Sequence, residues 1–186
     1  MPLTNKNDEQ LISEYLTSEK EEVFRLLLLK YTNQVYSFVR SMIGNTDAED
    51  ITQEVFIKVW RNLKKYKMGQ NFKTWLFSIA KNSTIDFLRK KKALNFSDLE
   101  NPGDDYSFSE TIESEDLLPD EAFQKLQNSE FLKKLLEQIS TEYKTILLLH
   151  YQEEMTFDEI GKILKKPLNT VKSSHRRAIL ELRKKI

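Results

Sequence analysis

Apolar side chains recur every three or four residues along most of this chain, and this spacing constrains the fold more than any other feature. It places the apolar residues on one side of an α-helix, and that side must be buried against a partner. With only four glycines and four prolines among 186 residues, the chain is poorly suited to a turn-rich β fold. We therefore predict an all-α protein.

The helical pattern is lost once, between residues 95 and 120, where two prolines, a glycine and many acids occur. A loop of that length is unusual inside a compact domain and favours a domain boundary. We predict two small helical domains joined by a flexible acidic linker. The first domain would span residues 1–94, the linker 95–122 and the second domain 123–186.

Three capping boxes, each a Ser or Thr followed three residues later by Glu, predict helix starts. They pair Ser18 with Glu21, Thr46 with Glu49, and Thr156 with Glu159. Gly44 is expected to end the helix that follows the first box, and Asn169 is expected to cap the last helix.

The helix expected after the second box has two contrasting sides. The side expected to face the core is an apolar stripe of Ile51, Val55, Phe56, Val59, Trp60 and Leu63. The outer side begins with acidic and polar residues and turns basic toward its end: Asp50, Gln53, Glu54 and Lys58. The same order also complements the helix dipole, so charge alone does not assign this face a partner.

Charge is segregated although the formal net charge is zero. Residues 58–92 hold eleven Lys/Arg and one acid, residues 97–121 hold ten Asp/Glu and no base, and residues 162–186 hold nine Lys/Arg and one acid. Two cationic segments separated by an anionic one indicate two contacts with a polyanion.

Residues 157–177 predict a helix-turn-helix, since Pro167 separates an amphipathic helix from a second, cation-rich helix. At ~100° per residue, one arc of the second helix is suited to packing: Val171, His175, Ala178, Ile179 and Leu182. The opposite arc is suited to DNA, because its side chains can donate to base edges: Lys172, Ser173, Arg176 and Arg177. Three lysines near the turn are candidates for phosphate contacts: Lys162, Lys165 and Lys166.

Catalysis is poorly supported. The absence of cysteine excludes disulfides, zinc ribbons and thiol chemistry, and the four glycines are too scattered for a phosphate-binding loop. His150 with Glu153 or Glu154 is only a weak metal signal. We expect no enzyme, cofactor or metal site. No signal peptide or bilayer-length apolar run is visible, so we expect a cytoplasmic protein without membrane insertion.

Two blocks of sequence resemble bacterial RNA polymerase sigma factors. "DAEDITQEVFIKVWRNLKKY", followed by "FKTWLFSIAKNSTIDFLRKKK", resembles their second conserved region. "LLEQISTEYKTILLLHYQEEMTFDEIGKILKKPLNTVKSSHRRAILELRK" resembles their fourth region. The short chain without the family's other large domains is similar to the extracytoplasmic-function (ECF) group.

This resemblance implies a specificity subunit that binds core RNA polymerase and directs transcription initiation at promoters. It implies docking on the clamp helices of the polymerase's largest subunit through Asp50, Gln53, Glu54 and Lys58. It implies recognition of a flipped base of the minus-10 element by Tyr66 and Asn82, with phosphate contacts from Lys81, Arg89, Lys90 and Lys91. It assigns the minus-35 element to Lys172, Ser173, Arg176 and Arg177, and suggests control by an anti-sigma factor.

Two other functions are compatible with parts of the sequence. A stand-alone helix-turn-helix transcriptional regulator would bind DNA without polymerase, as a dimer, and would not need the first basic segment or the Asp50–Lys58 face. A purely structural helical adaptor leaves both basic segments unexplained. We therefore favour the sigma factor.

Overall fold

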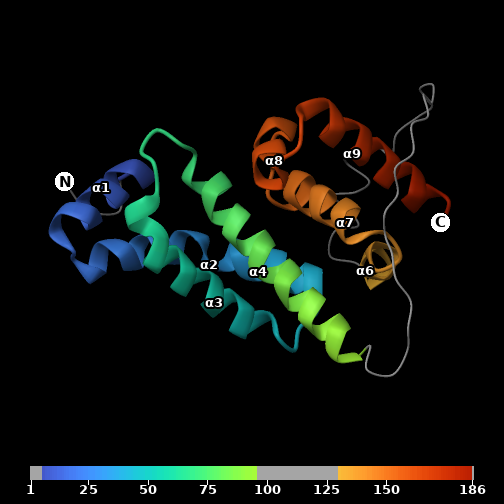
Figure 1. Ribbon diagram of the computed structural model, residues 1–186, viewed down its shortest axis with the longest axis horizontal. Coiled ribbons are helices and arrows are strands. Elements are labelled where there is room, and N and C mark those ends of the chain that lie inside the picture. The colour runs from blue at the N-terminus through green and yellow to red at the C-terminus, as the bar shows by residue number, and fades with distance from the viewer. Residues whose placement is uncertain (1–5, 96–129, 186) are drawn as a thin grey trace.

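The computed structural model describes residues 6–95 and 130–185, and these ranges contain helices and connecting turns but no strand, which confirms the all-α fold. Figure 1 shows two helical groups beside each other. The first consists of α1 (Asp8–Ser18), α2 (Glu21–Ile43), α3 (Ala48–Asn62), the short 3₁₀ turn η2 (Leu63–Lys65) and α4 (Phe72–Asn95). The second consists of α6 (Glu130–Leu136), α7 (Thr141–Leu147), the π-helical turn η3 (Leu148–Gln152), α8 (Phe157–Leu164) and α9 (Leu168–Arg183).

The first group packs around the long helix α2, which contacts α1, α3 and α4. Its buried side chains recur at helical spacing: Val23, Leu27, Tyr31, Val35, Phe38, Val39 and Met42. Phe38 meets Phe77 of α4 edge to face, with ring centroids 5.5 Å apart. Each such fully buried side chain contributes about 1.5–3 kcal/mol through the area it removes from water, so this stripe holds the three long helices together.

Helix ends in the first group agree only partly with the sequence prediction. Gly44 follows α2 with φ of 90°, a conformation that favours glycine, and the predicted stop is confirmed. The capping box of Ser18 and Glu21 is wrong, because Lys20 is the N-cap of α2 and makes no side-chain cap. The box of Thr46 and Glu49 is also wrong: Asp47 occupies the N-cap of α3, and its carboxylate instead pairs with Lys91 at 3.2 Å.

The second group is built on the predicted helix-turn-helix of α8 and α9. The Thr156 hydroxyl accepts from the Glu159 amide, and the Glu159 carboxylate accepts from the Thr156 amide, so the third capping box is confirmed. Lys165 ends α8 in the left-handed conformation, and Pro167 precedes α9. Asn169 is not the cap, because α9 already begins at Leu168.

The predicted linker, residues 95–122, lies outside the described residues except for Asn95 at the end of α4. In the parts of the chain that are described, no helix combines the length and apolar composition that crossing a bilayer requires.

The corrected helix starts lead to a first prediction, on Thr156 and Asn169. Thr156→Ala should lower the free energy of unfolding by about 1 kcal/mol, because the Glu159 amide at the start of α8 loses the Thr156 hydroxyl as its acceptor. Asn169→Ala should change it by less than about 0.5 kcal/mol, since this side chain does not cap α9. Urea unfolding followed by circular dichroism measures both. Equal losses for the two variants would contradict the described start of α9.

Candidate nucleic-acid and partner-binding surfaces

The outer arc of α9 brings together the four residues predicted to face DNA. Val171, Ala178, Ile179 and Leu182 are buried on its inner side. Lys172, Ser173 and Arg177 are exposed and Arg176 is half-buried on the other. The Ser173 hydroxyl donates to the Thr170 carbonyl at 3.0 Å, and its oxygen keeps lone pairs with which to accept from a base. The outer side of α9 is therefore a short cationic surface, and the buried side chains on its inner side hold it in place.

His175 is confirmed as a packing residue. Its side chain is buried, and its Nε2 atom lies 3.1 Å from the Tyr151 hydroxyl. The ring also lies against His150 and Phe157, with centroids 5.2 and 5.0 Å away. His175 thus fixes α9 against η3 and α8 and orients the opposite, cationic arc.

Two of the three lysines near the turn are paired with acids. Lys162 lies 2.7 Å from Asp158, and the hydrogen bond to this carboxylate raises the pKa of the lysine. Lys166 lies 2.6 Å from Glu142 of α7. Both pairs are accessible to solvent and contribute little to stability, so a phosphate could displace either acid. Lys165 occupies the left-handed position between the two helices.

The basic residues of α4 do not form one continuous face. Asn82 and Arg89, seven residues apart, are exposed on the same side of the helix, and Arg89 pairs with Asp86 at 3.2 Å. Lys90 is exposed farther round. Lys91 turns toward α3, where it pairs with Asp47 and lies 5.4 Å from the centre of the Phe87 ring. Lys81 is half-buried.

Tyr66 lies in the core of the first group rather than on its surface, with 6% of its area exposed. Its ring meets Phe72 and Trp75 edge on, with centroids 5.7 and 5.4 Å away, and its hydroxyl donates to the Gln70 carbonyl. Burial raises the pKa of this phenol, and the nearby charge of Glu9 raises it further. Asn82 lies ten residues beyond Phe72, which is about 15 Å farther along α4. Because the Tyr66 ring packs on Phe72, the structure does not bring Tyr66 and Asn82 together.

The α3 face keeps the predicted order of acid before base. Asp50, Gln53 and Glu54 are exposed, and Glu54 pairs with Lys58 at 2.6 Å one turn later. Lys58 is half-buried and also donates to the Ser83 hydroxyl on α4 at 2.9 Å. Lys58 therefore connects α3 to α4 and also forms the basic end of the outer α3 face.

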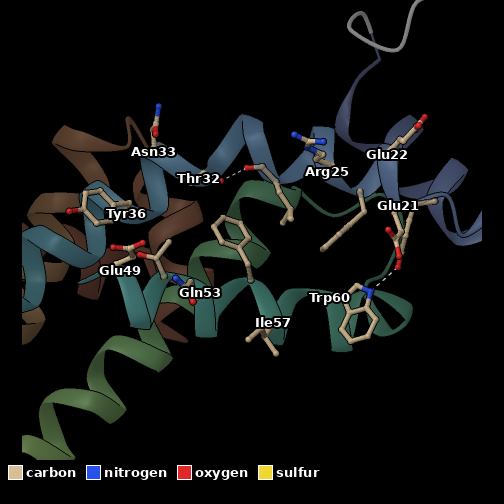
Figure 2. A pocket seen from close by; sticks show the side chains of 15 residues that line it. Glu21, Glu22, Arg25, Thr32, Asn33, Tyr36, Glu49, Gln53, Ile57 and Trp60 are labelled. Atoms are coloured by element: carbon tan, nitrogen blue, oxygen red, sulfur yellow. Dashed lines mark hydrogen bonds between the residues drawn. The ribbon is translucent and has the colours of Figure 1, made fainter. Parts of the chain in front are cut away.

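A groove between α2 and α3 was missed by the sequence analysis. It has a volume of about 960 Å³, and Figure 2 shows Ile57 and Trp60 below Thr32 and Arg25, with Glu49 and Gln53 at the other end. The prediction that Trp60 faces the core is wrong, because 55% of its area is exposed. The neighbouring Ile57 is also exposed, over 47% of its area. The Trp60 indole donates to the Tyr15 hydroxyl at 2.9 Å, which holds the ring at the groove's rim.

The missed signal lies in the angular spread of the α3 side chains. Relative to Val55, and at ~100° per residue, Phe56, Trp60 and Ile57 fall about 100–200° away, next to Gln53. A single buried stripe cannot extend from Val55 to side chains about 100–200° away on a helix that also has a polar side. These residues therefore form a second apolar surface, which the structure leaves open to solvent.

The weak metal signal at residues 150–154 is explained by other contacts. His150 stacks on Phe157, with ring centroids 4.4 Å apart, and its Nδ1 atom lies 2.8 Å from the Met155 carbonyl. Glu153 is paired with Lys73. Within residues 6–95 and 130–185, no group of three His, Cys, Asp or Glu side chains is placed to hold a metal ion.

Two family models match the chain. The model described as Sigma-70 region 2 matches residues 27–94, and the model described as Sigma-70, region 4 matches residues 131–182. The first match contains α3, with the residues that it contributes to the groove, and the cations of α4. The second contains the helix-turn-helix.

Several curated proteins are similar over nearly the whole chain. The ECF RNA polymerase sigma factor SigW of Bacillus subtilis is 33% identical over 168 residues, which cover 89% of this chain and 90% of SigW. SigX of the same organism is 28% identical over 165 residues, covering 88% and 84%. The sigma-E factor of Escherichia coli K12 is 25% identical over 176 residues, covering 89% and 87%.

Solved structures share the fold. CnrH, determined in complex with the cytosolic domain of CnrY, has a TM-score of 0.68 at 19% identity and covers 95% of this chain and 94% of that one. RpoE of Bartonella quintana, determined with the anti-sigma factor NepR, has a TM-score of 0.66 at 23% identity and covers 87% and 94%.

Proposed function

The chain belongs to the ECF group of RNA polymerase sigma factors, and on that premise we propose how its surfaces divide the work of promoter-specific transcription initiation. Sigma factors are non-enzymatic initiation factors that bind core RNA polymerase and promoter DNA. One observation carries the proposal: two separate groups of cations, on α4 and on α9, lie in the two segments that match Sigma-70 regions 2 and 4. A single DNA-binding module would need only one of them.

We assign the minus-35 element to α9. Its exposed arc presents Lys172, Ser173, Arg176 and Arg177 on a helix that is buried on its other side. Arginine pairs with guanine O6 and N7 in the major groove, and a serine hydroxyl accepts or donates. Lys162, Lys165 and Lys166 lie at the preceding turn, where phosphate contacts would fix the register of the helix on the duplex.

We assign the minus-10 element to α4 and the connector before it. Asn82 and Arg89 lie on one exposed side, where an amide can read a base edge and a guanidinium can hold a phosphate. Lys81, Lys90 and Lys91 complete the cationic set, with Lys91 first released from Asp47. Stacking of a flipped base on Tyr66 would require the phenol to leave Phe72 and Trp75, so this role is coupled to movement of the connector.

Core polymerase would dock on α3 and the adjacent groove. Asp50, Gln53 and Glu54 supply the polar edge, with Lys58 at its end, while Ile57 and Trp60 supply exposed apolar area. Exposed apolar residues beside polar ones are typical of interface cores, and tryptophan is enriched among residues that dominate binding energy.

The domain ranges follow: region 2 within residues 1–94, the acidic linker at 95–122, and region 4 within 123–186. The spans matched by the two family models support this division.

An anti-sigma factor is the proposed regulator, and the cytoplasm is the proposed location, since polymerase and promoters are there. Both solved relatives named above were determined with a partner protein, and NepR is described as an anti-sigma factor.

The deciding experiment compares initiation and DNA binding on a genomic fragment library with and without bacterial core polymerase. We expect initiation at defined sites only when chain and core are both present. Tight sequence-specific binding by the chain alone, with no initiation when core is added, would instead establish a stand-alone helix-turn-helix regulator.

Trp60→Ala should weaken binding to core polymerase by about 30-fold, as truncation of an interface tryptophan that dominates the binding energy commonly does. The matched control is Leu29→Ala, which removes an apolar side chain that is 63% exposed on α2 and does not line the groove. Fluorescence anisotropy of labelled chain with core measures both. Equal affinities for the two variants would contradict docking at the groove.

Arg176→Ala should weaken binding to the minus-35 element by about 5- to 150-fold, the value of one bidentate base contact, and leave affinity for core unchanged. Lys184→Ala removes a cation just beyond α9 and serves as the control. Competition with single-base variants of the element locates the base that Arg176 reads. Parallel losses in core and promoter binding would refute the division of labour.

Asn82→Ala should slow promoter opening while leaving the closed complex intact, because the amide is assigned to a base that is unstacked only in the open state. Permanganate reactivity of melted thymines measures opening, and filter binding at low temperature measures the closed complex. Wild-type reactivity in the variant would remove Asn82 from the minus-10 site.

A further inference from the structure

Asn169 lies in the first turn of α9, and its side chain has no role in forming that helix. Pro167 is the N-cap and α9 begins at Leu168, so Asn169 lies two positions beyond the N-cap and does not cap the helix. Its side chain is exposed, and within residues 6–95 and 130–185 no hydrogen bond to its amide is found. The carbonyl and the amino group of this side chain both face solvent.

Helical geometry places Asn169 on the same outer arc as the residues assigned to DNA. Val171 marks the buried side of α9. At ~100° per residue, Asn169 points about 160° away from Val171, while Ser173 and Arg176 point about 200° and 140° away. The three side chains therefore follow one another along the exposed side of α9 in three successive turns, and Asn169 is the first of them.

The lysines of the turn before α9 would hold this end of the helix close to DNA. Lys165 and Lys166 directly precede Pro167, at the junction that Figure 1 shows between α8 and α9. The first turn of α9 contains no acid that would repel phosphate. Phosphate contacts orient a recognition helix, and its N-terminal residues are the ones that contact base edges. An outward-facing side chain in the first turn is thus well placed to reach the major groove.

The amide of asparagine has a defined partner among the bases. Its carbonyl oxygen accepts from adenine N6 and its amino group donates to adenine N7, so the two contacts together read an A·T pair. The residues already assigned to the minus-35 element have other preferences, because arginine and lysine pair with guanine and a serine hydroxyl pairs with several bases. Asn169 would therefore add a kind of base recognition that those four residues lack.

The position of Asn169 along α9 also indicates where its base lies. Asn169 and Arg176 are seven residues apart, which is a rise of about 10 Å along the helix. Base pairs follow one another every ~3.4 Å on B-DNA. When α9 lies along the groove, the bases read by these two side chains are about three base pairs apart.

We propose that Asn169 is a specificity-determining residue, and that its amide reads an adenine of the minus-35 element about three base pairs from the base that Arg176 reads. The inference deepens the proposed function and rests on it, because it assigns a further base contact to the helix that is proposed to bind this element.

The first test measures the base preferences of the holoenzyme formed by the full chain and core polymerase. Its affinity is compared across promoter fragments that carry each single-base variant of the minus-35 element. Asn169→Ala should weaken binding to the preferred element by about 5- to 150-fold and abolish the preference for adenine at one position, while the other positions keep theirs. Arg176→Ala, measured alongside, should lose its preference about three base pairs away.

Two controls accompany this comparison. Gln138→Ala removes an exposed amide of the same helical group outside α9, and it should keep the native base preferences. Urea unfolding of Asn169→Ala should give a free energy of unfolding within about 0.5 kcal/mol of the native value, as expected for a side chain that does not cap α9. A loss of affinity in this variant then reports the missing contact with DNA.

The second test changes the base instead of the protein. 7-Deazaadenine keeps the N6 amino group of adenine but lacks the N7 acceptor. At the position identified in the first test, it should weaken the wild-type holoenzyme by about 2- to 10-fold, the value of one hydrogen bond. It should not weaken the Asn169→Ala holoenzyme further, since this variant has no amide to donate.

The outcomes separate this inference from the proposed function. Native base preferences in Asn169→Ala, loss of preference for a base other than adenine, or equal effects of 7-deazaadenine on both proteins would overturn the role of Asn169 and leave the sigma-factor function intact. Positions for Asn169 and Arg176 that are adjacent in the element would overturn the predicted spacing. A wild-type holoenzyme without any preference in the minus-35 element would overturn the proposed function of α9 and this inference together.

Discussion

Burial of one narrow apolar stripe per helix is the constraint on which the rest of this structure depends. α9 buries Val171, Ala178 and Leu182, and the residues between them are left facing outward by geometry alone. The same applies to α3, whose stripe through Val55 and Val59 leaves the acids and Trp60 on other sides. The surfaces proposed to bind DNA and polymerase are thus the exposed sides of helices whose orientation is set by buried side chains. His175 illustrates the dependence, since its contacts with Tyr151 and Phe157 set the rotation of α9.

The interface between the two groups follows a different rule. It contains the ion pair of Lys73 with Glu153 and hydrogen bonds to main-chain carbonyls, and contacts between domains of one chain are commonly this polar. Lys144 on the Met42 carbonyl and Lys73 on the Glu153 carbonyl satisfy acceptors at the end of α2 and after η3. Such contacts favour one docking geometry with a modest net free energy.

Local features were predictable from the sequence and long-range ones were not. The Thr156 box and the Gly44 stop are decided within a few residues, and both were found. Ser18 and Thr46 have the same letter pattern, but neither is the N-cap of the helix that follows, and Asp47 is drawn instead to Lys91, 44 residues away. Tyr66 and Trp60 show the same limit, because aromatic partners from α4 cover Tyr66 while the groove leaves Trp60 open. The exposed arc of α9 could be predicted because one helix determines it, whereas the contact of α4 with α8 has no signature in either helix alone.

The two ion pairs beside the helix-turn-helix have a thermodynamic consequence. Lys162 is paired with Asp158, and Lys166 is paired with Glu142. An anion that binds either lysine must first displace a carboxylate, so part of its binding free energy is offset by the loss of an ion pair. Anion binding at this turn is therefore the exchange of one counter-ion for another, and its net gain is smaller than an unpaired lysine would give.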